Sequence, residues 1–152
     1  MIDYRLEHIL SYQCTLADPE IIGPLPEGIR VNFYTAQGEF AGPRLTGKVR
    51  TVGGDWVTVR QDGVALLDVR ATFETHDNAL ILVTYPGTVD FGVDGYEKFL
   101  RGEMPQVVKL RTAPRFSTVD PKYIWLNRLH CLGIGEYNSE AKRVAYDVYG
   151  VT

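Results

Sequence analysis

The sequence predicts an all-β fold: one antiparallel β-barrel of nine or ten strands with a single short helix, formed by residues 1–152 as one domain. Nearly every segment alternates apolar and polar residues with a period of two, which is typical of strands with one buried face. Turn-forming pairs such as Gly53-Gly54 and Asp62-Gly63 separate these segments at the spacing expected of a sandwich or barrel. We favour the barrel because closing a sheet removes its exposed edges.

The alternation and the turn signals together place nine strands along the chain. They are expected over residues 6–16, 29–36, 44–52, 56–60, 64–75, 79–85, 107–116, 123–132 and 143–151. A loop rich in Pro and Gly, from Pro19 to Gly28, follows the first strand, and Pro114 interrupts the seventh. The single helix is expected near residues 95–101, with Gly102 as its stop signal.

The bulk composition excludes several classes of protein. The net charge is −3, so no basic field draws the chain to nucleic acid or to anionic lipid. No stretch approaches the ~20 apolar residues of a membrane span, and no basic region followed by an apolar run predicts a signal peptide. We therefore expect a cytoplasmic protein without a membrane or nucleic-acid partner. Cys14 and Cys131 are far apart, and Cys14, within an alternating strand, is expected to be a buried free thiol.

One strand carries a continuous row of polar side chains. In the segment 64–75, the residues Asp68, Arg70, Thr72 and Glu74 point to one face, and apolar residues mostly point to the other. Such a row is either an ordinary solvated face or the wall of a polar cavity inside the barrel. The choice decides whether Asp68 or Glu74 could act on a bound molecule.

The turn at Asp62-Gly63 determines which residues join this row. A two-residue turn places Asp55 opposite Arg70, as a surface ion pair, and puts Trp56 on the apolar face. A three-residue loop, with Gly63 in the left-handed conformation, instead places Trp56 opposite Asp68, on the face of the polar row. At the other end of the strand, a two-residue turn at Asp77-Asn78 places Tyr85 opposite Arg70.

Two further groups of residues are candidates for ligand binding. Arg111 and Arg115 could hold an anionic or carbonyl-bearing ligand, because a guanidinium presents a rigid fork of donors; the alternative is two surface arginines beside a proline bend. Tyr123, Trp125 and Asn127 alternate along a predicted strand and offer stacking surfaces and an amide; the alternative is an aromatic core with a hydrogen-bonded Asn.

Motifs for metals and common cofactors are missing from the sequence. The histidines His8, His76 and His130 have no ligand-like spacing, and we expect no metal site. No nucleophile elbow or phosphate loop is present, and Gly133-Ile134-Gly135 is too short to indicate a dinucleotide site. The expected function therefore requires no cofactor.

Several short motifs, in order and over nearly the whole chain, resemble the DUF3237 family, also called UPF0311. They include Phe40-Ala-Gly-Pro-Arg-Leu-Thr-Gly47, Leu67-Asp-Val-Arg-Ala-Thr-Phe-Glu-Thr75, Arg111-Thr-Ala-Pro-Arg-Phe116 and Tyr123-Ile-Trp-Leu-Asn-Arg128. The resemblance implies a lipocalin-like β-barrel, and it implies that some relatives are cofactor-independent enzymes that cyclise or isomerise phenolic compounds. Family members often have Pro where this chain has Gln61, and a Pro-Asp-Gly sequence suits the longer loop.

We expect a small, mainly apolar or aromatic molecule to bind inside the barrel against Trp56, Tyr85, Tyr123 and Trp125, with Arg70, Arg111 and Arg115 holding its polar group. The first hypothesis is a cofactor-free isomerase, cyclase or lyase in which Asp68 or Glu74 is the base, Tyr85 the acid, and Arg70 stabilises developing charge. The second is a non-catalytic binding protein. The third is a structural or interaction module; exposure of Asp68, Arg70 and Thr72 on the outer face of the sheet would support it and exclude the other two. A homodimer is also compatible with a barrel of this size.

Overall fold

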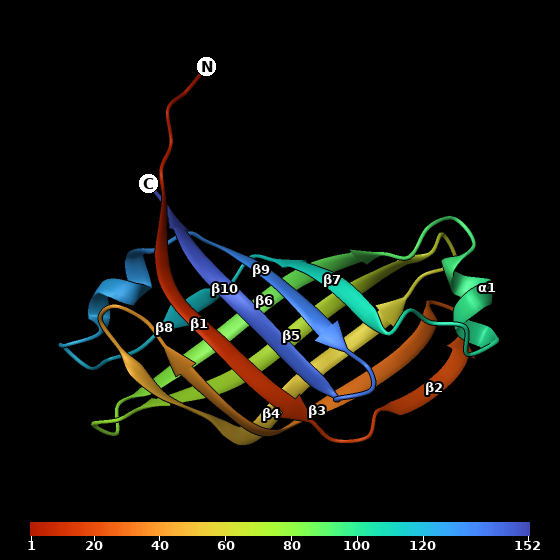
Figure 1. Ribbon diagram of the computed structural model, residues 1–152, viewed down its shortest axis with the longest axis horizontal. Coiled ribbons are helices and arrows are strands. Elements are labelled where there is room, and N and C mark those ends of the chain that lie inside the picture. The colour runs from red at the N-terminus through yellow and green to blue at the C-terminus, as the bar shows by residue number, and fades with distance from the viewer.

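The computed structural model describes residues 1–152 as a closed antiparallel barrel with one α-helix (Figure 1). Eight strands form the ring in the order β1-β10-β9-β7-β6-β5-β4-β3, and pairing of β1 with β3 closes it. Two short strands are added to the ring: β2 pairs with the first half of β3, and β8 pairs with β6. The all-β barrel predicted from the alternation is confirmed. None of the helices is long and apolar enough to span a membrane.

The strands and helices have the following bounds: β1 Leu6–Leu16, β2 Glu20–Leu25, β3 Gly28–Ala41, β4 Thr46–Val59, β5 Val64–Thr75, β6 Leu80–Asp90, α1 Gly95–Leu100, β7 Val107–Thr112, β8 Arg115–Ser117, the 3₁₀ helix η1 Ile124–Arg128, β9 Cys131–Asn138 and β10 Arg143–Val151. The predicted limits of β1, β5 and β10 are confirmed residue for residue, and α1 lies where the short helix was expected. The interruption of residues 107–116 at Pro114 is confirmed as the gap between β7 and β8.

Several Gly and Pro residues of types common in turns lie within strands instead. Gly38 lies within β3, and Gly53-Gly54 lie within β4, at a point where the register with β5 shifts. β6 continues through Pro86, which has no N–H to donate. On that side Pro86 faces the break between β8 and β7, so no strand pairing is lost there. The carbonyl of Pro86 accepts a hydrogen bond from the Ala113 amide at 3.1 Å. The predicted 19–28 loop contains the exposed edge strand β2, a position that tolerates Pro24.

The prediction of a strand over residues 123–132 is wrong. This segment begins with η1, and the buried side chains are Tyr123 and Leu126, three residues apart. A spacing of three fits a 3₁₀ helix, in which residues i and i+3 share a face. The chain becomes extended again only at Cys131, where β9 begins.

The hairpin between β4 and β5 has the three-residue loop that was one of the two alternatives. Val59 pairs with Ala65, and the amide of Arg60 donates to the carbonyl of Val64 at 2.9 Å, so that Gln61, Asp62 and Gly63 form the loop. Gly63 has φ +83, in the left-handed region. Trp56 therefore shares the face of the polar row, as this register requires.

The hairpin between β5 and β6 is one residue longer than predicted. Thr75 donates its amide to the carbonyl of Ala79, so the loop holds three residues, the last of them Asn78 with φ +69. Tyr85 consequently pairs with Val69 rather than with Arg70. The prediction that Tyr85 and Arg70 share a face is wrong, because the extra loop residue moves every β6 side chain to the opposite face.

We predict that Gly63→Ala lowers the free energy of unfolding by more than about 2 kcal/mol, because left-handed backbone is costly for Ala and the closely packed backbone must also move. A Cβ atom on Gly63 would lie 1.7 Å from the carbonyl oxygen of Gly92. The measurement is urea unfolding followed by circular dichroism. Gly102→Ala is the matched control, because Gly102 also has positive φ but its Cβ would meet nothing within 4 Å; a loss of about 1 kcal/mol is expected there. Equal losses in the two variants would contradict the role of the close contact.

Candidate functional site

The barrel encloses an apolar cavity of about 290 Å³. Its walls come from the inward-facing residues of the strands, among them Val57 and Val59 of β4 and Val69 of β5. Next to the cavity, aromatic side chains fill the barrel interior. Phe40 stacks on Phe73 there, with a distance of 4.8 Å between the ring centroids. The cavity is large enough for a molecule the size of one or two fused rings, since an engineered cavity of about 150 Å³ holds benzene.

One carboxylic acid lines this apolar cavity. Asp55 alternates with Val57 and Val59 along β4, and its position opposite Val69 places it on the inner face. Its Oδ1 accepts a hydrogen bond from the backbone N–H of Asp68 at 2.9 Å, whereas Oδ2 has no protein donor. The chain reaches this position through the Gly53-Gly54 irregularity: Gly53 has φ +82, and a Cβ on Gly54 would lie 2.0 Å from the carbonyl oxygen of Phe33.

The environment of Asp55 disfavours its charged form. Burial raises the pKa of the Asp55 carboxyl from 3.8 to about 7; the hydrogen bond from Asp68 N opposes the rise and the charge of Asp68 adds to it. No lysine, arginine or histidine lines the cavity, so no protein cation compensates the carboxylate. An acid with a pKa near neutrality can both accept and return a proton at ordinary pH.

Three tyrosines of the cavity lie together across the barrel. The hydroxyls of Tyr12 (β1) and Tyr85 (β6) are hydrogen-bonded to each other, and Tyr146 (β10) stacks on Tyr12 with a centroid distance of 5.0 Å. Burial raises the pKa of all three phenols well above 10, and the charge of Asp55 contributes to each shift. The phenols therefore stay protonated and are available as hydrogen-bond donors.

The polar row of β5 lies on the outside of the barrel. The side chains of Asp68 and Arg70 are 57% and 59% exposed and form an ion pair at 3.3 Å, Thr72 is half-buried on the same outer face, and Glu74 pairs with Lys48 and Arg50 at 3.5 and 3.3 Å. The interpretation of this row as a cavity wall is wrong, because the alternation directs Val69 and Phe73 inward instead.

Trp56 also lies outside, with the guanidinium carbon of Arg70 5.5 Å from its ring centroid. The exposure of Asp68, Arg70 and Thr72 supports the structural module and excludes the two ligand hypotheses in the form that was built on this row. The opposite face of the same sheet nevertheless lines a cavity, so ligand binding depends on other residues than this row. Among the four predicted catalytic residues, Tyr85 alone reaches the cavity.

The two candidate arginines do not meet inside the barrel either. Arg111 and Arg115 are exposed on the outer faces of β7 and β8, and Arg111 Nη1 donates to the carbonyl of Leu110. Their orientation matches the alternative of surface arginines beside the Pro114 bend. The expectation that they hold the polar group of an interior ligand is wrong, because the side chains that alternate with them, Leu110 and Phe116, point inward.

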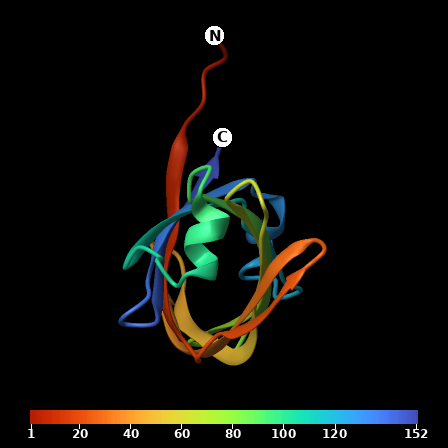
Figure 2. The ribbon, with the colours of Figure 1, turned by 90° about the vertical axis from the view of Figure 1, so that its right-hand side faces the viewer.

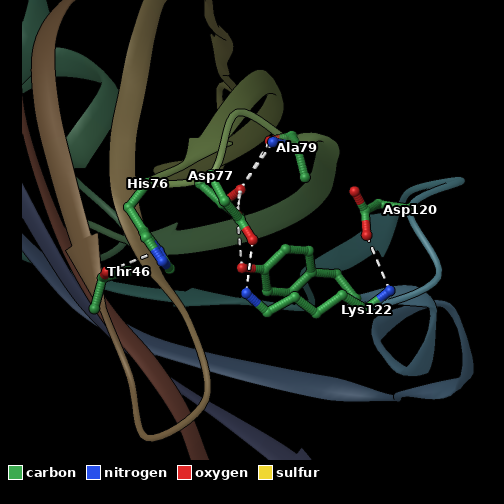
Figure 3. A network of polar contacts seen from close by, with 8 residues as sticks. Thr46, His76, Asp77, Ala79, Asp120 and Lys122 are labelled. Carbon is green, nitrogen blue, oxygen red and sulfur yellow. Dashed lines mark hydrogen bonds and ion pairs between the residues drawn. The ribbon is translucent and has the colours of Figure 1, made fainter.

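Tyr123 and Asn127 have structural partners at the end of the barrel opposite α1 (Figure 1). Figure 3 shows the network of polar contacts around Asp77 and Lys122 at this end. The Tyr123 hydroxyl donates to Asp77 Oδ1 at 2.7 Å, where the Thr75 hydroxyl also donates, and Lys122 Nζ donates to Oδ2 at 2.6 Å. The hydrogen bonds from Lys122, Thr75 and Tyr123, in that order, hold the pKa of Asp77 far below its ordinary value.

Asn127 and Trp125 also have structural partners at this end of the barrel. Asn127 bonds both the amide and the carbonyl of Thr118, each at 2.9 Å. Trp125 is half-buried under the guanidinium of Arg44, 3.8 Å from its ring centroid. Tyr123, Trp125 and Asn127 thus hold η1 against the barrel, and none of them lines the cavity.

Sequence reasoning missed Asp55, Tyr12 and Tyr146. The available signal was the alternation along each strand. Asp55 is two residues from Val57, and Tyr146 is two residues from Val148, so each points to the same face as an apolar residue. A charged residue in register with an apolar face is more informative than a row of polar residues, because it requires a reason for its burial.

The opposite end of the cavity is covered by the segment that contains α1, which lies across the barrel opening in Figure 2. Phe91, Phe99, Met104 and Pro105 of this segment line the cavity, as does Ile21 of the exposed strand β2. The segment that contains α1 therefore closes the cavity at this end of the barrel.

We predict that Tyr123→Phe lowers the free energy of unfolding by about 1–3 kcal/mol, because the hydrogen bond from the buried Tyr123 hydroxyl to Asp77 is lost. The substitution should leave ligand binding in the cavity unchanged. Urea unfolding is the measurement. The matched control is Tyr149→Phe, whose hydroxyl has no protein partner. A change in cavity binding in Tyr123→Phe would contradict the purely structural assignment.

Asp55 makes stability depend on pH with a defined sign. The folded protein retains the Asp55 proton up to about pH 7, whereas the unfolded chain loses it near 3.8. The folded state binds more protons between these values, so the contribution of Asp55 to stability falls as pH rises from 4 to 7, by at most about 4 kcal/mol.

We therefore predict that Asp55→Asn is more stable than the wild type at pH 8 and that the gap narrows toward pH 4. Urea unfolding of both proteins between pH 4 and pH 8 measures this difference in the free energy of unfolding. Glu136→Gln is the matched control, because it is the same acid-to-amide change at an exposed position outside the cavity. A pH-independent gap for Asp55→Asn would show that Asp55 titrates normally.

Comparison with known proteins agrees with this fold. The UPF0311 protein of Rhodopseudomonas palustris is 32% identical over 148 residues, which cover 95% of each chain. A β-barrel-like protein from Acinetobacter baumannii has 27% identity and a TM-score of 0.83, over 100% of this chain and 98% of that one. An enzyme from Penicillium herquei shares the fold at 24% identity and a TM-score of 0.74, over 100% and 97%. The family described as "Protein of unknown function (DUF3237)" matches residues 4–151, and the chain belongs to this family.

Proposed function

We propose that the barrel binds a small, mainly apolar carbonyl compound in its cavity and moves a proton on the carbon beside the carbonyl, as a cofactor-independent isomerase, cyclase or lyase. The observation that carries this proposal is a single carboxyl, Asp55, in the same apolar cavity as the hydrogen-bonded phenols of Tyr12 and Tyr85. The carboxylate can act as the base, the phenols can donate hydrogen bonds to the carbonyl oxygen, and the apolar wall can bind the rest of the molecule.

Asp55 is suited to the role of base. Its Oδ2 has no protein donor and is free to accept a proton from a ligand, while the amide of Asp68 holds Oδ1 in place. Its pKa of about 7 keeps a large fraction ionised at neutral pH and still makes the carboxylate a stronger base than an exposed one.

The phenol pair is suited to bind the carbonyl oxygen. Within the pair one hydroxyl donates to the other, and the accepting phenol keeps its own proton for a ligand. The bond it receives strengthens it as a donor, since hydrogen bonds in a chain polarise one another. A donor fixed beside the oxygen that becomes negative stabilises the enolate more than the ketone.

The proposed step balances without a further reactant. The C–H proton next to the carbonyl passes to Asp55, the C–H electron pair forms the C=C bond of the enolate, and the carbonyl π pair moves to oxygen. Asp55 then returns the proton to the same or another carbon. Return to another carbon isomerises the molecule, and the same enolate can expel a leaving group or close a ring. Redox chemistry is not involved.

Two other observations bear on function. The barrel fold also occurs in an enzyme from Penicillium herquei, which supports the compatibility of this architecture with catalysis by analogy of fold alone. The wall is apolar apart from a few groups, which favours the alternative of a non-catalytic binding protein. Both functions use the same cavity and differ in whether Asp55 exchanges a proton with the ligand.

Deuterium exchange into 2-indanone in D₂O, followed by proton NMR, tests the catalytic step. This ketone is neutral, aromatic and small enough for the cavity, and its exchange requires abstraction of the proton beside the carbonyl. We expect the protein to accelerate exchange above the buffer rate. Asp55→Asn should reduce the acceleration by about 10²–10⁴-fold, and Tyr85→Phe by about 10²–10³-fold.

Two variants on the outer surface complete the experiment. Glu136→Gln should retain the full rate, because the residue is exposed and outside the cavity. Arg70→Ala distinguishes the cavity from the outer polar row: a large loss would assign the chemistry to the row. Binding of 2-indanone without any acceleration would contradict catalysis and favour the non-catalytic alternative.

A further inference from the structure

The charge inside the cavity is unbalanced, and this constrains the ligand. Above its pKa Asp55 holds a carboxylate against apolar walls, and its protein contacts are the Asp68 amide and the neighbouring side chains of the cavity. A buried charge without a partner is costly, so the folded protein gains from any ligand that neutralises it. A proton is one such partner, and a cationic ligand is another.

We propose that, among molecules of one shape, the cavity binds hydrophobic amines most tightly; these have an apolar ring body and one protonated nitrogen that pairs with Asp55, so that they compete with the carbonyl compound for the same carboxylate. The inference rests on the proposed ligand cavity, and it names the chemical class of ligand independently of the proton-transfer step. In a site of low dielectric, an ammonium at contact distance from the carboxylate gains far more than it would in water.

The aromatic composition of the cavity supports a cation. Tyr12, Tyr85, Tyr146 and Phe73 all line it, and the negative faces of aromatic rings attract ammonium groups. The phenol oxygens of Tyr12 and Tyr85 can in addition accept hydrogen bonds from N–H donors. A carboxylate combined with aromatic rings offers an ammonium both an ion pair and a polarisable wall.

The groups that face Asp55 from the other strands add no competing positive charge. The titratable groups that line the cavity with Asp55 are Tyr12 and Cys14 on β1, Tyr85 on β6, Tyr137 on β9 and Tyr146 on β10, and the Asp68 carboxylate acts on Asp55 from the outer face of β5. None of these groups is a lysine, an arginine or a histidine. The nearest arginine on β5, Arg70, lies on the outer face with Asp68. A ligand carboxylate would therefore meet repulsion and no cation.

A matched series of indane probes tests the proposal. 2-Aminoindane is cationic, 2-indanol is its neutral isostere and indane-2-carboxylate is the anion. Isothermal titration calorimetry gives the Kd of each probe. At pH 8 we expect the amine to bind at least about tenfold more tightly than the alcohol, and the carboxylate at least about tenfold more weakly.

The pH dependence supplies a signature that a nonspecific apolar pocket lacks. Below the titration of Asp55 a proton competes with the ammonium, so the affinity for 2-aminoindane should fall about tenfold per pH unit. The amine itself stays protonated up to about pH 9, because unperturbed amines titrate near pH 10. 2-Indanol carries no charge and should show no such loss on acidification.

Asp55→Asn should remove the preference for the amine and its pH dependence while the affinity for 2-indanol is retained. A wild-type protein that binds 2-indanol at pH 8 as tightly as 2-aminoindane overturns the inference and leaves the proposed function intact. Unchanged amine binding in Asp55→Asn overturns it as well. Failure of all three probes and of 2-indanone to bind overturns both proposals, because the cavity would then bind no ligand. The wild-type pH series needs no variant and decides the matter even if Asp55→Asn does not fold.

Discussion

The close approach of the Gln61–Gly63 loop to the segment before α1 is the constraint on which the rest of the structure depends. The loop has three residues because Gly63 adopts a left-handed conformation beside the carbonyl of Gly92. That length sets the pairing of β4 with β5 and with it the face on which each side chain lies. One residue fewer would turn Asp55 to solvent and Trp56 to the interior. The same contact joins the hairpin to the cover of the cavity.

The interior combines a stable scaffold with an unfavourable charge. Stacked Phe40 and Phe73 and the cap formed by Tyr123 and Asp77 fill and close one end of the barrel. The cavity near the other end holds a carboxyl whose ionisation opposes folding. Proteins keep such groups where function needs them and offset their cost elsewhere. The packing and hydrogen bonds at one end of the barrel help to offset the energetic cost of the Asp55 carboxylate near the other end.

Local patterns predicted much of the fold. Strict alternation and a clear Asp-Gly turn gave the limits of β5, and the alternation alone gave those of β1 and β10. Gly53-Gly54 and Pro86 misled because their effect depends on neighbouring strands: a bulge in one case and a break between β8 and β7 in the other. The resemblance to the DUF3237 family was confirmed. The candidate site was largely missed, since loop lengths that differ by one residue exchange the inner and outer faces.

The cavity is built from two sources that can change independently. The acid and the phenols lie on ring strands, where their positions are fixed by backbone pairing, whereas Phe91, Phe99, Met104 and Pro105 belong to a connecting segment that lies outside the ring. Connections tolerate substitution and insertion far better than paired strands do. Substitutions in the connecting segment would therefore change the size and shape of the cavity without moving Asp55 or the tyrosines, because strand pairing holds those residues. Such a division makes the fold evolvable.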